Sequence, residues 1–356
     1  MKILVIKFRH IGDVLLSTPL IENLKHCYPE ATIDFALNKG CEDILADNPY
    51  INNIIVYNRA KIKKLNFFLR LLEEIKFTKR IRSNKYDLVI NLTEGERGAQ
   101  LTFFSNAKMK LGFSVRKGVF SRINVFDLMG NDQIEQHTVE KDLQFINFLE
   151  KDINNKVVSV FWPKNIEQEI DKILNDNKIT DYVHIHPVSR WMFKCWEDER
   201  MAEIIDFLQK EKNIKVIITG APVQKEKDRI RKILSLCKTS PLDLSGILSL
   251  KHLAYLSFRA RFFFGVDTAP MHIAAATGTP VIALFGASQS LRWGPWNNCE
   301  NTRVAYKNIN ANQINGQHII ISRTNHTIFY DKYVKKCKGM VEIEVEDVKN
   351  IINDII

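Results

Sequence analysis

Apolar residues in the first part of the chain occur in short continuous runs that alternate with segments of helical spacing. The runs are bounded by turn residues and predict buried strands at residues 2–6, 31–36, 53–57 and 86–91. A helix is expected from about residue 14 to residue 27. Pro19 within it should kink the helix or mark a late start, because proline cannot donate a backbone hydrogen bond. Strands that alternate with helices are typical of a parallel α/β sheet.

The same pattern restarts in the second part of the chain. Strands are predicted at residues 182–186, 215–219, 261–265 and 281–285, and helices at residues 226–236 and 271–276. Apolar residues at helical spacing from Met201 to Leu208 predict a further helix. Residues 307–338 are irregular and rich in Asn, Lys and His, which predicts a loop-like insertion. Residues 346–356 alternate acidic and apolar positions, as in a terminal amphipathic helix.

The length of 356 residues is about twice that of a typical domain. A polar stretch near residues 150–181 separates the two occurrences of the pattern, so the domain boundary is expected there. The predicted fold class is α/β, with two Rossmann-like domains whose parallel sheets face a central cleft. The first domain spans residues 1–165 and the second residues 180–345. The helix at residues 346–356 is expected to pack back on the first domain.

Composition is that of an ordinary globular protein. The sequence is 45% hydrophobic and 26% charged, which excludes a disordered or fibrous chain. No apolar run approaches the roughly 18 residues of a membrane helix, and the polar Lys7 follows the opening apolar run too soon for a signal peptide. The six cysteines show no C-x-x-C spacing and are expected to be reduced thiols. Together these features predict a cytoplasmic protein.

The chain is basic, with 51 Lys and Arg residues against 41 Asp and Glu residues and a formal charge of +10. This excess favours an anionic partner, which could be nucleic acid, a phosphorylated substrate or an anionic membrane surface. Ten basic and only two acidic residues lie in the segment from Arg59 to Lys85. The segment is either a solvated face or, because Phe67, Phe68 and neighbouring leucines are interleaved with the charges, a surface that lies against lipid headgroups.

Several common site motifs are missing from the sequence. It contains no G-x-x-x-x-G-K-[ST], no G-x-G-x-x-G after a strand, no H-E-x-x-H and no Cys/His cluster with zinc spacing. A P-loop enzyme and the usual dinucleotide site are therefore disfavoured. His184 and His186 alternate on one predicted strand and could chelate a metal in principle. Two histidines that share one face of a strand near the sheet edge are the favoured interpretation, so no metal site is predicted.

One candidate site segment, residues 7–13, directly follows the first strand. Ligands of open α/β sheets bind at the carboxyl ends of the strands, which is where this segment lies. Gly12 would permit a tight turn, and Asp13 would then stand at the start of the following helix. Aspartate is among the best helix-capping residues, so position alone leaves both a cap and a catalytic carboxylate open for Asp13.

The second candidate segment, residues 264–276, runs from a strand through a turn into an alanine-rich helix. Pro270 lies near the first helical turn, where the backbone amides and the helix dipole form a ready anion site. Thr268 could add a hydroxyl donor and His272 an imidazole donor. The alternative, a well-capped core helix without a ligand, stays open.

Three segments, in this order, resemble the bacterial lipopolysaccharide heptosyltransferases, which form glycosyltransferase family 9. They are residues 7–19 (K-F-R-H-I-G-D-V-L-L-S-T-P), residues 186–196 (H-P-V-S-R-W-M-F-K-C-W) and residues 267–296, which begin D-T-A-P-M-H-I-A-A-A and end W-G-P-W. The resemblance spans both domains and is closest to the heptosyltransferase III branch. It implies the GT-B fold and transfer of heptose from ADP-heptose with inversion.

The resemblance also assigns roles to residues. Asp13 corresponds to the general base on the acceptor hydroxyl, and Lys194 to the cation that neutralises the departing diphosphate. The expected donor-binding residues are Ser189, Glu226, Asp267, Thr268, Ala269, Pro270, Met271 and His272. The acceptor-binding residues are expected from position and charge instead: Gly12 lies beside Asp13, and the basic Arg59, Lys61, Lys63 and Lys64 suit an anionic acceptor. The family often has Gly where Ala269 stands, and some relatives carry a cysteine-rich segment of which only Cys337 remains here.

The expected function is therefore inverting transfer of heptose from ADP-L-glycero-D-manno-heptose to the inner core of lipopolysaccharide, without a metal or other cofactor. The acceptor would be a phosphorylated, Kdo-bearing core anchored in the inner leaflet, with peripheral contact between the protein and the anionic membrane. An alternative is another GT-B enzyme that uses a different nucleotide sugar or epimerises one. A nucleic-acid-binding protein is the remote alternative, because only the net charge favours it.

Overall fold

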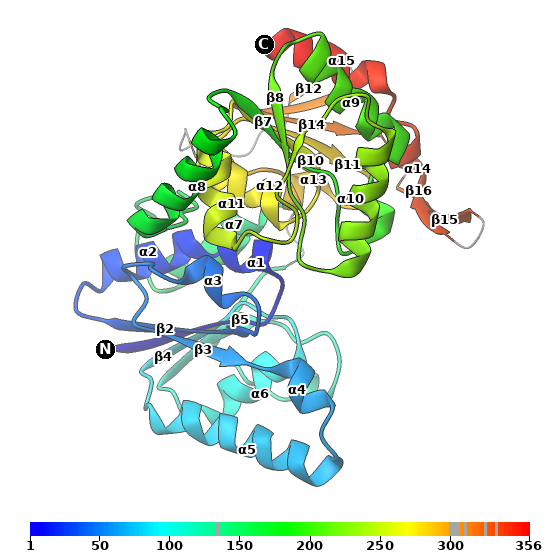
Figure 1. Ribbon diagram of the computed structural model, residues 1–356. Coiled ribbons are helices and arrows are strands. Elements are labelled where there is room, and N and C mark those ends of the chain that lie inside the picture. The colour runs from blue at the N-terminus through cyan, green and yellow to red at the C-terminus, as the bar shows by residue number, and fades with distance from the viewer. Residues whose placement is uncertain (133–134, 299–306, 310–311, 324–325, 332–333) are drawn as a thin grey trace. The chain divides into compact units, whose positions relative to one another are not determined.

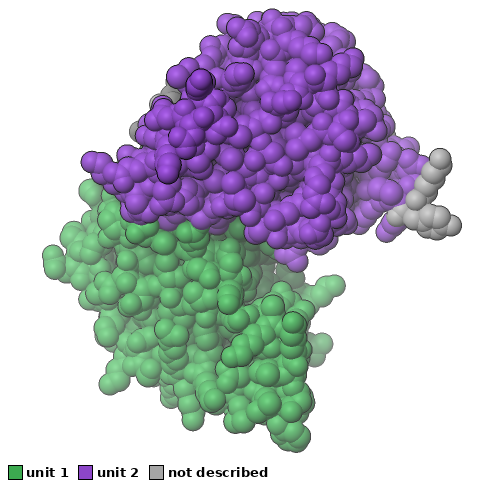
Figure 2. Space-filling view, in the orientation of Figure 1, with its two compact units in different colours: residues 1–161 green, residues 162–356 purple. Residues whose placement is uncertain are grey.

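The computed structural model describes the chain except for residues 133–134, 299–306, 310–311, 324–325 and 332–333, which are grey in Figure 1. The chain divides into two compact units, Met1–Phe161 and Trp162–Ile356 (Figure 2). The division falls inside the polar stretch in which the boundary was expected. Among the described residues, no helix is both long enough and apolar enough to cross a membrane.

Unit 1 is built on a six-stranded parallel sheet with the strand order β3-β2-β1-β4-β5-β6. Its strands are β1 (Lys2–Lys7), β2 (Thr32–Asn38), β3 (Asn53–Tyr57), β4 (Leu88–Asn91), β5 (Met109–Phe113) and β6 (Leu128–Gly130). In the centre of the sheet, Ile3 of β1 is paired with Ile33 of β2 and with Leu88 of β4. This strand order is that of the Rossmann fold.

Helices cover both faces of this sheet (Figure 1), so its central strands are apolar on both sides. One face carries α1 (Ile11–Leu15), α2 (Thr18–Cys27), α3 (Glu42–Leu45) and α7 (Thr138–Phe148). The other carries α4 (Arg59–Lys63), α5 (Phe67–Ser83) and α6 (Glu96–Phe104), and a short 3-10 turn, Val119–Arg122, follows β5. Pro19 stands in the first turn of α2. The late helix start predicted from Pro19 is therefore confirmed.

Unit 2 is built on an eight-stranded sheet with the order β12-β13-β14-β11-β10-β7-β8-β9. Its parallel strands are β7 (Tyr182–His186), β8 (Lys215–Ile218), β9 (Leu242–Asp243), β10 (Phe262–Val266), β11 (Val281–Phe285) and β14 (His318–Ser322). Its helices are α8 (Lys164–Asp176), α9 (Asp198–Lys210), α10 (Gln224–Leu236), α11 (Leu250–Arg259), α12 (Ala269–Ala276), α13 (Ser290–Trp293), α14 (Lys338–Val341) and α15 (Val345–Ile355). A 3-10 turn, Met192–Lys194, lies between β7 and α9.

The prediction of a loop-like insertion at residues 307–338 is wrong for the part of this segment that the structure describes. It contains β12 (Lys307–Ile309), β13 (Asn312–Asn315) and β14, which extend the main sheet, and a hairpin of β15 (Ile328–Asp331) and β16 (Val334–Cys337). Ile320 and Ile321 of β14 are buried beside β11. The surrounding Asn and Lys residues obscured this short apolar run, which has the pattern of a buried strand.

The polar stretch at residues 150–181 also contains an unpredicted element. Residues Lys164–Asp176 form α8, and Ile166, Ile170 and Leu174 are its buried residues. These three residues follow each other at intervals of four and form a narrow apolar stripe on an otherwise polar helix. The low overall hydrophobicity of the segment made it resemble a linker.

The terminal helix α15 packs within unit 2, contrary to the expectation that it would return to the first domain. Val348, Ile351 and Ile352 are buried in the main core cluster of unit 2, and α15 contacts α9. Lys349 forms an ion pair of 2.8 Å with Glu203 of α9. The apolar face of the helix is therefore covered by unit 2 itself.

Candidate functional site

Lys194 and Asp267 form an ion pair at the carboxyl ends of two adjacent strands of unit 2. Lys194 ends the 3-10 turn after β7, and Asp267 directly follows β10. Because β7 and β10 are neighbouring parallel strands, both side chains reach the same edge of the sheet, and Lys194 Nζ lies 2.6 Å from Asp267 Oδ2. An ammonium group has three donors, so Asp267 can hold the lysine in place while other donors bind an anion.

This geometry changes the role expected for Asp267. A carboxylate repels a phosphate group and cannot donate a hydrogen bond to it, so Asp267 is unsuited to bind a diphosphate directly. Its Oδ2 instead accepts a hydrogen bond from Lys194. This contact suits a positioning role of Asp267 toward the lysine, and its contact with the donor stays a prediction.

The turn after Asp267 leads into α12 and matches the predicted anion site in part. Thr268 is the N-cap residue, and Pro270 lies in the first helical turn. Pro270 has no N–H, and the amide of Met271 donates to the carbonyl of Thr268 at 3.1 Å. Thr268 and Ala269 carry the other amides of this turn, and the Thr268 hydroxyl donates a hydrogen bond of 3.4 Å to the carbonyl of Val266. Met271 is fully buried in the core, and His272 is also buried.

Ser189 and Glu226 are both buried and both shape loops at this edge of the sheet. The Ser189 hydroxyl accepts a hydrogen bond of 3.2 Å from the amide of Trp191, in the loop that carries Lys194. Glu226 is in the first turn of α10 and accepts a hydrogen bond of 3.0 Å from the amide of Ala221. Both contacts fix backbone, and a direct contact of either residue with a ligand stays a prediction.

The two histidines of β7 are structural residues. His184 contacts the hydroxyls of Ser257 at 2.9 Å and Thr219 at 2.8 Å, and His186 contacts Thr219 at 2.9 Å. Burial lowers the pKa of each imidazole to about 3, so both are neutral at physiological pH. The strand lies between β8 and β10 and not near the sheet edge as expected. No group of three or more His, Cys, Asp or Glu residues in the described part of the chain could hold a metal ion.

Asp13 caps the first helix of unit 1. Its Oδ2 accepts a hydrogen bond of 3.3 Å from the amide of His10, and the residue is half-buried. The capping hydrogen bond uses one of the two carboxylate oxygens of Asp13. A carboxylate can therefore cap the helix and accept a proton on its other oxygen. Gly12 is a buried helical residue of α1 and is not among the glycines with a positive φ. The tight turn predicted at Gly12 is therefore wrong.

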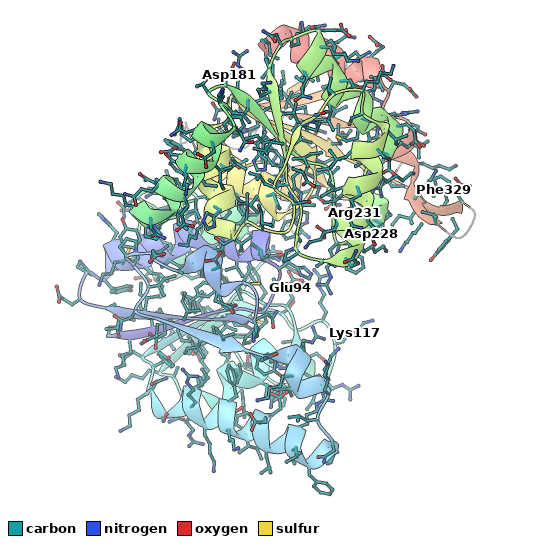
Figure 3. The ribbon with its side chains drawn as sticks, in the orientation of Figure 1. Glu94, Lys117, Asp181, Asp228, Arg231 and Phe329 are labelled. Carbon is teal, nitrogen blue, oxygen red and sulfur yellow. The ribbon has the colours of Figure 1, made fainter. Side chains whose placement is uncertain are left out.

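Sequence reasoning missed a charged cluster at the same end of the unit 1 sheet. Glu94, which follows β4 and is labelled in Figure 3, lies 3.2 Å from Arg9 and 2.9 Å from Arg116, and it also pairs with Lys141 of α7. Burial by itself raises the pKa of Glu94, but the hydrogen bond and charge of Lys141, with Arg9 and Arg116, outweigh it and leave this pKa below its ordinary value. Burial lowers the pKa of Lys141. The basic partners of Glu94 are far from it in sequence, so no local sequence pattern predicts this cluster.

Replacing Glu94 with glutamine should destabilise unit 1 by about 3 kcal/mol, because it leaves the buried Lys141 without its carboxylate partner. The matched control is Glu73→Gln, whose exposed pair with Lys76 at 3.1 Å should contribute less than about 1 kcal/mol. Urea unfolding of both variants measures the difference. Since the pKa of Glu94 is lowered in the folded state, its contribution is present above about pH 4.5 and is lost as the pH falls through the folded pKa. Equal unfolding midpoints for the two variants at pH 7 would contradict the assignment.

A pocket of about 620 Å³ lies at the carboxyl ends of the unit 1 strands. Phe8, Asn38, Arg59 and Thr93 line it from the ends of β1, β2, β3 and β4. The remaining lining residues come from α5, from the loop after β4 and from α6: Phe67, Arg70, Leu71, Glu74, Gly95, Glu96, Arg97 and Gln100.

Charged and aromatic contacts organise this pocket. Arg97 lies over the ring of Tyr57, 4.0 Å from its centroid, and pairs with Glu74 at 2.9 Å. Glu74 also accepts a hydrogen bond of 2.6 Å from the Tyr57 hydroxyl. Of the predicted acceptor-binding residues, Arg59 lines the pocket. Lys61, Lys63 and Lys64 are exposed on and just after α4 and are not among its lining residues.

Comparisons with known proteins agree with this architecture. Residues 75–317 match the family described as glycosyltransferase family 9 (heptosyltransferase). The lipopolysaccharide heptosyltransferase 3 of Escherichia coli is 33% identical over 296 residues, which cover 82% of this chain and 85% of the relative. This chain belongs to glycosyltransferase family 9. It is therefore a glycosyltransferase, and the resemblance found in its sequence is confirmed.

Solved structures of the family share the fold over the whole chain. A family 9 glycosyltransferase from Veillonella parvula DSM 2008 has a TM-score of 0.81 at 20% identity and covers 99% of this chain, which spans 96% of that structure. The E. coli heptosyltransferase WaaC with ADP has a TM-score of 0.75 at 18% identity, with full coverage of both chains. The predicted GT-B fold, with two parallel-sheet α/β domains, is confirmed.

Proposed function

We propose that this glycosyltransferase transfers heptose from ADP-L-glycero-D-manno-heptose to the inner core of lipopolysaccharide, in a step like that of heptosyltransferase III. The observation that carries the proposal is the Lys194–Asp267 pair beside the N-cap of α12. It places the Lys194 ammonium group and backbone amide donors together at a strand end, where they can bind a diphosphate. The 33% identity to a lipopolysaccharide heptosyltransferase 3 supports the donor and the acceptor class.

The donor diphosphate is proposed to bind in unit 2. Lys194 supplies a positive charge, the Thr268 and Ala269 amides and the Thr268 hydroxyl supply hydrogen bonds, and the N-terminus of α12 adds its dipole. Pro270 and Met271 hold the turn through backbone geometry and core packing. Ser189, Glu226 and His272 are proposed to complete the donor site.

The acceptor is proposed to bind in unit 1. The Arg59 and Arg70 side chains line the pocket at the strand ends, which suits an acceptor that carries phosphate or carboxylate groups. Gly12 adjoins Asp13 in α1 and is proposed to contact the acceptor through its backbone. Lys61, Lys63 and Lys64 add positive charge outside the pocket.

The proposed reaction requires a base on the acceptor and a cation on the leaving group. Asp13 removes the proton from the acceptor hydroxyl, whose oxygen attacks the anomeric carbon on the side opposite the diphosphate. A new glycosidic bond forms as the bond to the diphosphate breaks, with inversion at that carbon. The electron pair of the broken bond leaves with ADP, whose growing negative charge Lys194 stabilises.

The acceptor class also determines where the enzyme would work. A core oligosaccharide under construction is anchored by its lipid in the inner leaflet, so we propose a cytoplasmic enzyme in peripheral contact with the anionic inner face of that membrane. The net charge of +10 supports such a contact.

We expect EDTA to leave the transfer rate essentially unchanged. The reason is that a lysine and a helix N-terminus supply the positive charge that a divalent cation would otherwise provide. The measurement is ADP release with and without chelator, followed by addition of magnesium or manganese. A loss of activity that either metal restores would contradict the proposed role of Lys194.

The function is tested by incubating the protein with ADP-heptose and lipopolysaccharide cores truncated to increasing lengths. Mass spectrometry should find one added heptose on one core and an equivalent of ADP. UDP-sugars run in parallel test the alternative donors, and an isomerised nucleotide sugar without transfer would indicate an epimerase. Absence of transfer to every core would overturn the proposed acceptor.

A further inference from the structure

Helix α5 carries large apolar side chains on the side that faces away from its own sheet. Ile81 is its buried residue. The pocket residues Glu74 and Arg70 lie on the same side of the helix, seven and eleven residues before Ile81. Phe68, Leu72 and Ile75 follow one another at spacings of four and three residues, about half a turn away from that side. They therefore form a separate outward stripe.

These three residues are unusually exposed. Phe68 is 75% exposed, Leu72 is 51% exposed and Ile75 is 41% exposed, and Phe67, whose ring lies 5.7 Å from that of Phe68, is 74% exposed. Single exposed apolar residues are normal on a protein surface, but a contiguous stripe on one helix marks an interaction site. In Figure 1, α5 lies on the outer side of unit 1.

Basic residues surround the stripe. Lys61, Lys63 and Lys64 precede α5, and Lys79, Arg80 and Arg82 occupy its later turns. The two acidic residues of the helix are already engaged, Glu73 with Lys76 and Glu74 with Arg97. The stripe is thus an apolar surface within a strongly positive field.

We propose that α4 and α5 dock the protein on an anionic bilayer, with Phe68, Leu72 and Ile75 inserted at the boundary between headgroups and acyl chains. The surrounding lysines and arginines would bind lipid phosphates while their aliphatic stems lie along the apolar boundary. A second copy of the chain does not fit this surface, because pairing two such faces would bring like charges together. A bilayer with anionic lipids complements both the charge and the apolar stripe.

The same helix lines the proposed acceptor pocket. Phe67 and Leu71, one and three residues from Phe68, are lining residues of the pocket. Docking through α5 therefore places the pocket beside the lipid surface, and a membrane-anchored oligosaccharide can enter it without leaving its leaflet. This consequence rests on the proposed function, whereas the docking itself does not.

The test measures binding of the full chain to vesicles of phosphatidylcholine alone and of phosphatidylcholine with 30 mol% phosphatidylglycerol. The insertion variant is Phe68→Gln, Leu72→Gln and Ile75→Gln together, since glutamine is a good helix former. The matched control replaces three exposed apolar residues of unit 2, Val223, Leu236 and Ile247, with glutamine. The charge variant replaces Lys61, Lys63 and Lys64 with glutamine.

We expect wild type and control to bind anionic vesicles and to bind neutral vesicles at least 10-fold less. The insertion variant and the charge variant should each bind anionic vesicles about 10-fold more weakly than wild type, or weaker still. Added salt should lower the affinity of wild type for anionic vesicles, as the loss of the three lysines does. Because lipid binding is read without donor or acceptor, these results stand or fall separately from the proposed heptose transfer.

Equal vesicle binding by wild type and the insertion variant would overturn the proposal, as would absence of wild-type binding to anionic vesicles. A dimer of wild type that the insertion variant abolishes, found by sedimentation equilibrium without lipid, would also overturn it, because a second copy would then cover the stripe. Circular dichroism and thermal unfolding establish that each variant is folded. If heptose transfer is found, a water-soluble core lacking its lipid should be used equally well by wild type and the insertion variant.

Discussion

Asp13→Asn should lower the turnover number by roughly 10²–10⁴-fold while ADP binds with unchanged affinity. Asparagine keeps the size of the side chain and an oxygen that can accept the hydrogen bond from the His10 amide, now at 3.3 Å. It cannot accept a proton from a hydroxyl group, so the chemical step loses its base. Initial rates with saturating donor and acceptor measure the turnover number, and calorimetric titration measures the affinity for ADP.

A second capping aspartate provides the control for this experiment. Asp347 accepts a hydrogen bond of 2.8 Å from the amide of Glu344 at the start of α15, in the same cap geometry as Asp13 at the start of α1. Asp347→Asn should leave turnover unchanged. If Asp13→Asn also turns over at nearly the wild-type rate, Asp13 is a cap without a catalytic role.

Lys194→Ala should lower kcat by roughly 10²–10³-fold and raise the donor KM by much less. The charge on the diphosphate grows as the glycosidic bond breaks, so an ammonium group there stabilises the transition state more than the bound donor. Steady-state kinetics with varied ADP-heptose separates the two parameters. The pair with Asp267 at 2.6 Å keeps the ammonium group at the strand end before the donor arrives.

The control for Lys194 is another lysine of unit 2 that is paired with an aspartate. The exposed Lys232 lies 2.8 Å from the buried Asp198, and Lys232→Ala should leave both kcat and KM unchanged. Thermal unfolding of Lys194→Ala shows whether Asp267, left without its partner, destabilises the unit. An unchanged kcat with a greatly raised donor KM would mean that Lys194 binds the donor but does not stabilise the transition state.

The residues proposed for the acceptor and for the donor occupy corresponding positions in their own units. Asp13 and the pocket residues follow strands of unit 1, and Lys194, Asp267 and Thr268 follow strands of unit 2. Both groups lie at carboxyl ends of parallel strands, where the loops are free to carry polar groups because the strands themselves are buried. The same fold can therefore carry different sugar specificities through changes in these loops alone.

The sequence by itself determined the fold class and the local position of most elements. Strands β3, β7 and β11 begin and end at the residues predicted for them. Strand β11 is apolar and buried at every position, as expected of a strand in the interior of a parallel sheet. The family motifs also placed Asp13, Lys194 and Thr268 after the correct strands. Local patterns were misleading at α8 and β14, where a few apolar residues are embedded in long polar segments.

Only the tertiary structure decided which side chains meet. Lys194 and Asp267 are 73 residues apart, and they pair because β7 and β10 are neighbours although two strands separate them in sequence. Glu94, which follows β4, pairs with Lys141 of α7, 47 residues away in sequence. The apolar face of α15 is covered by α9 of its own unit. The periodicity of apolar residues predicts which face of an element is buried. Strand order and helix packing determine which other element covers that face. Those depend on the packing of the whole unit, which no local stretch of sequence specifies.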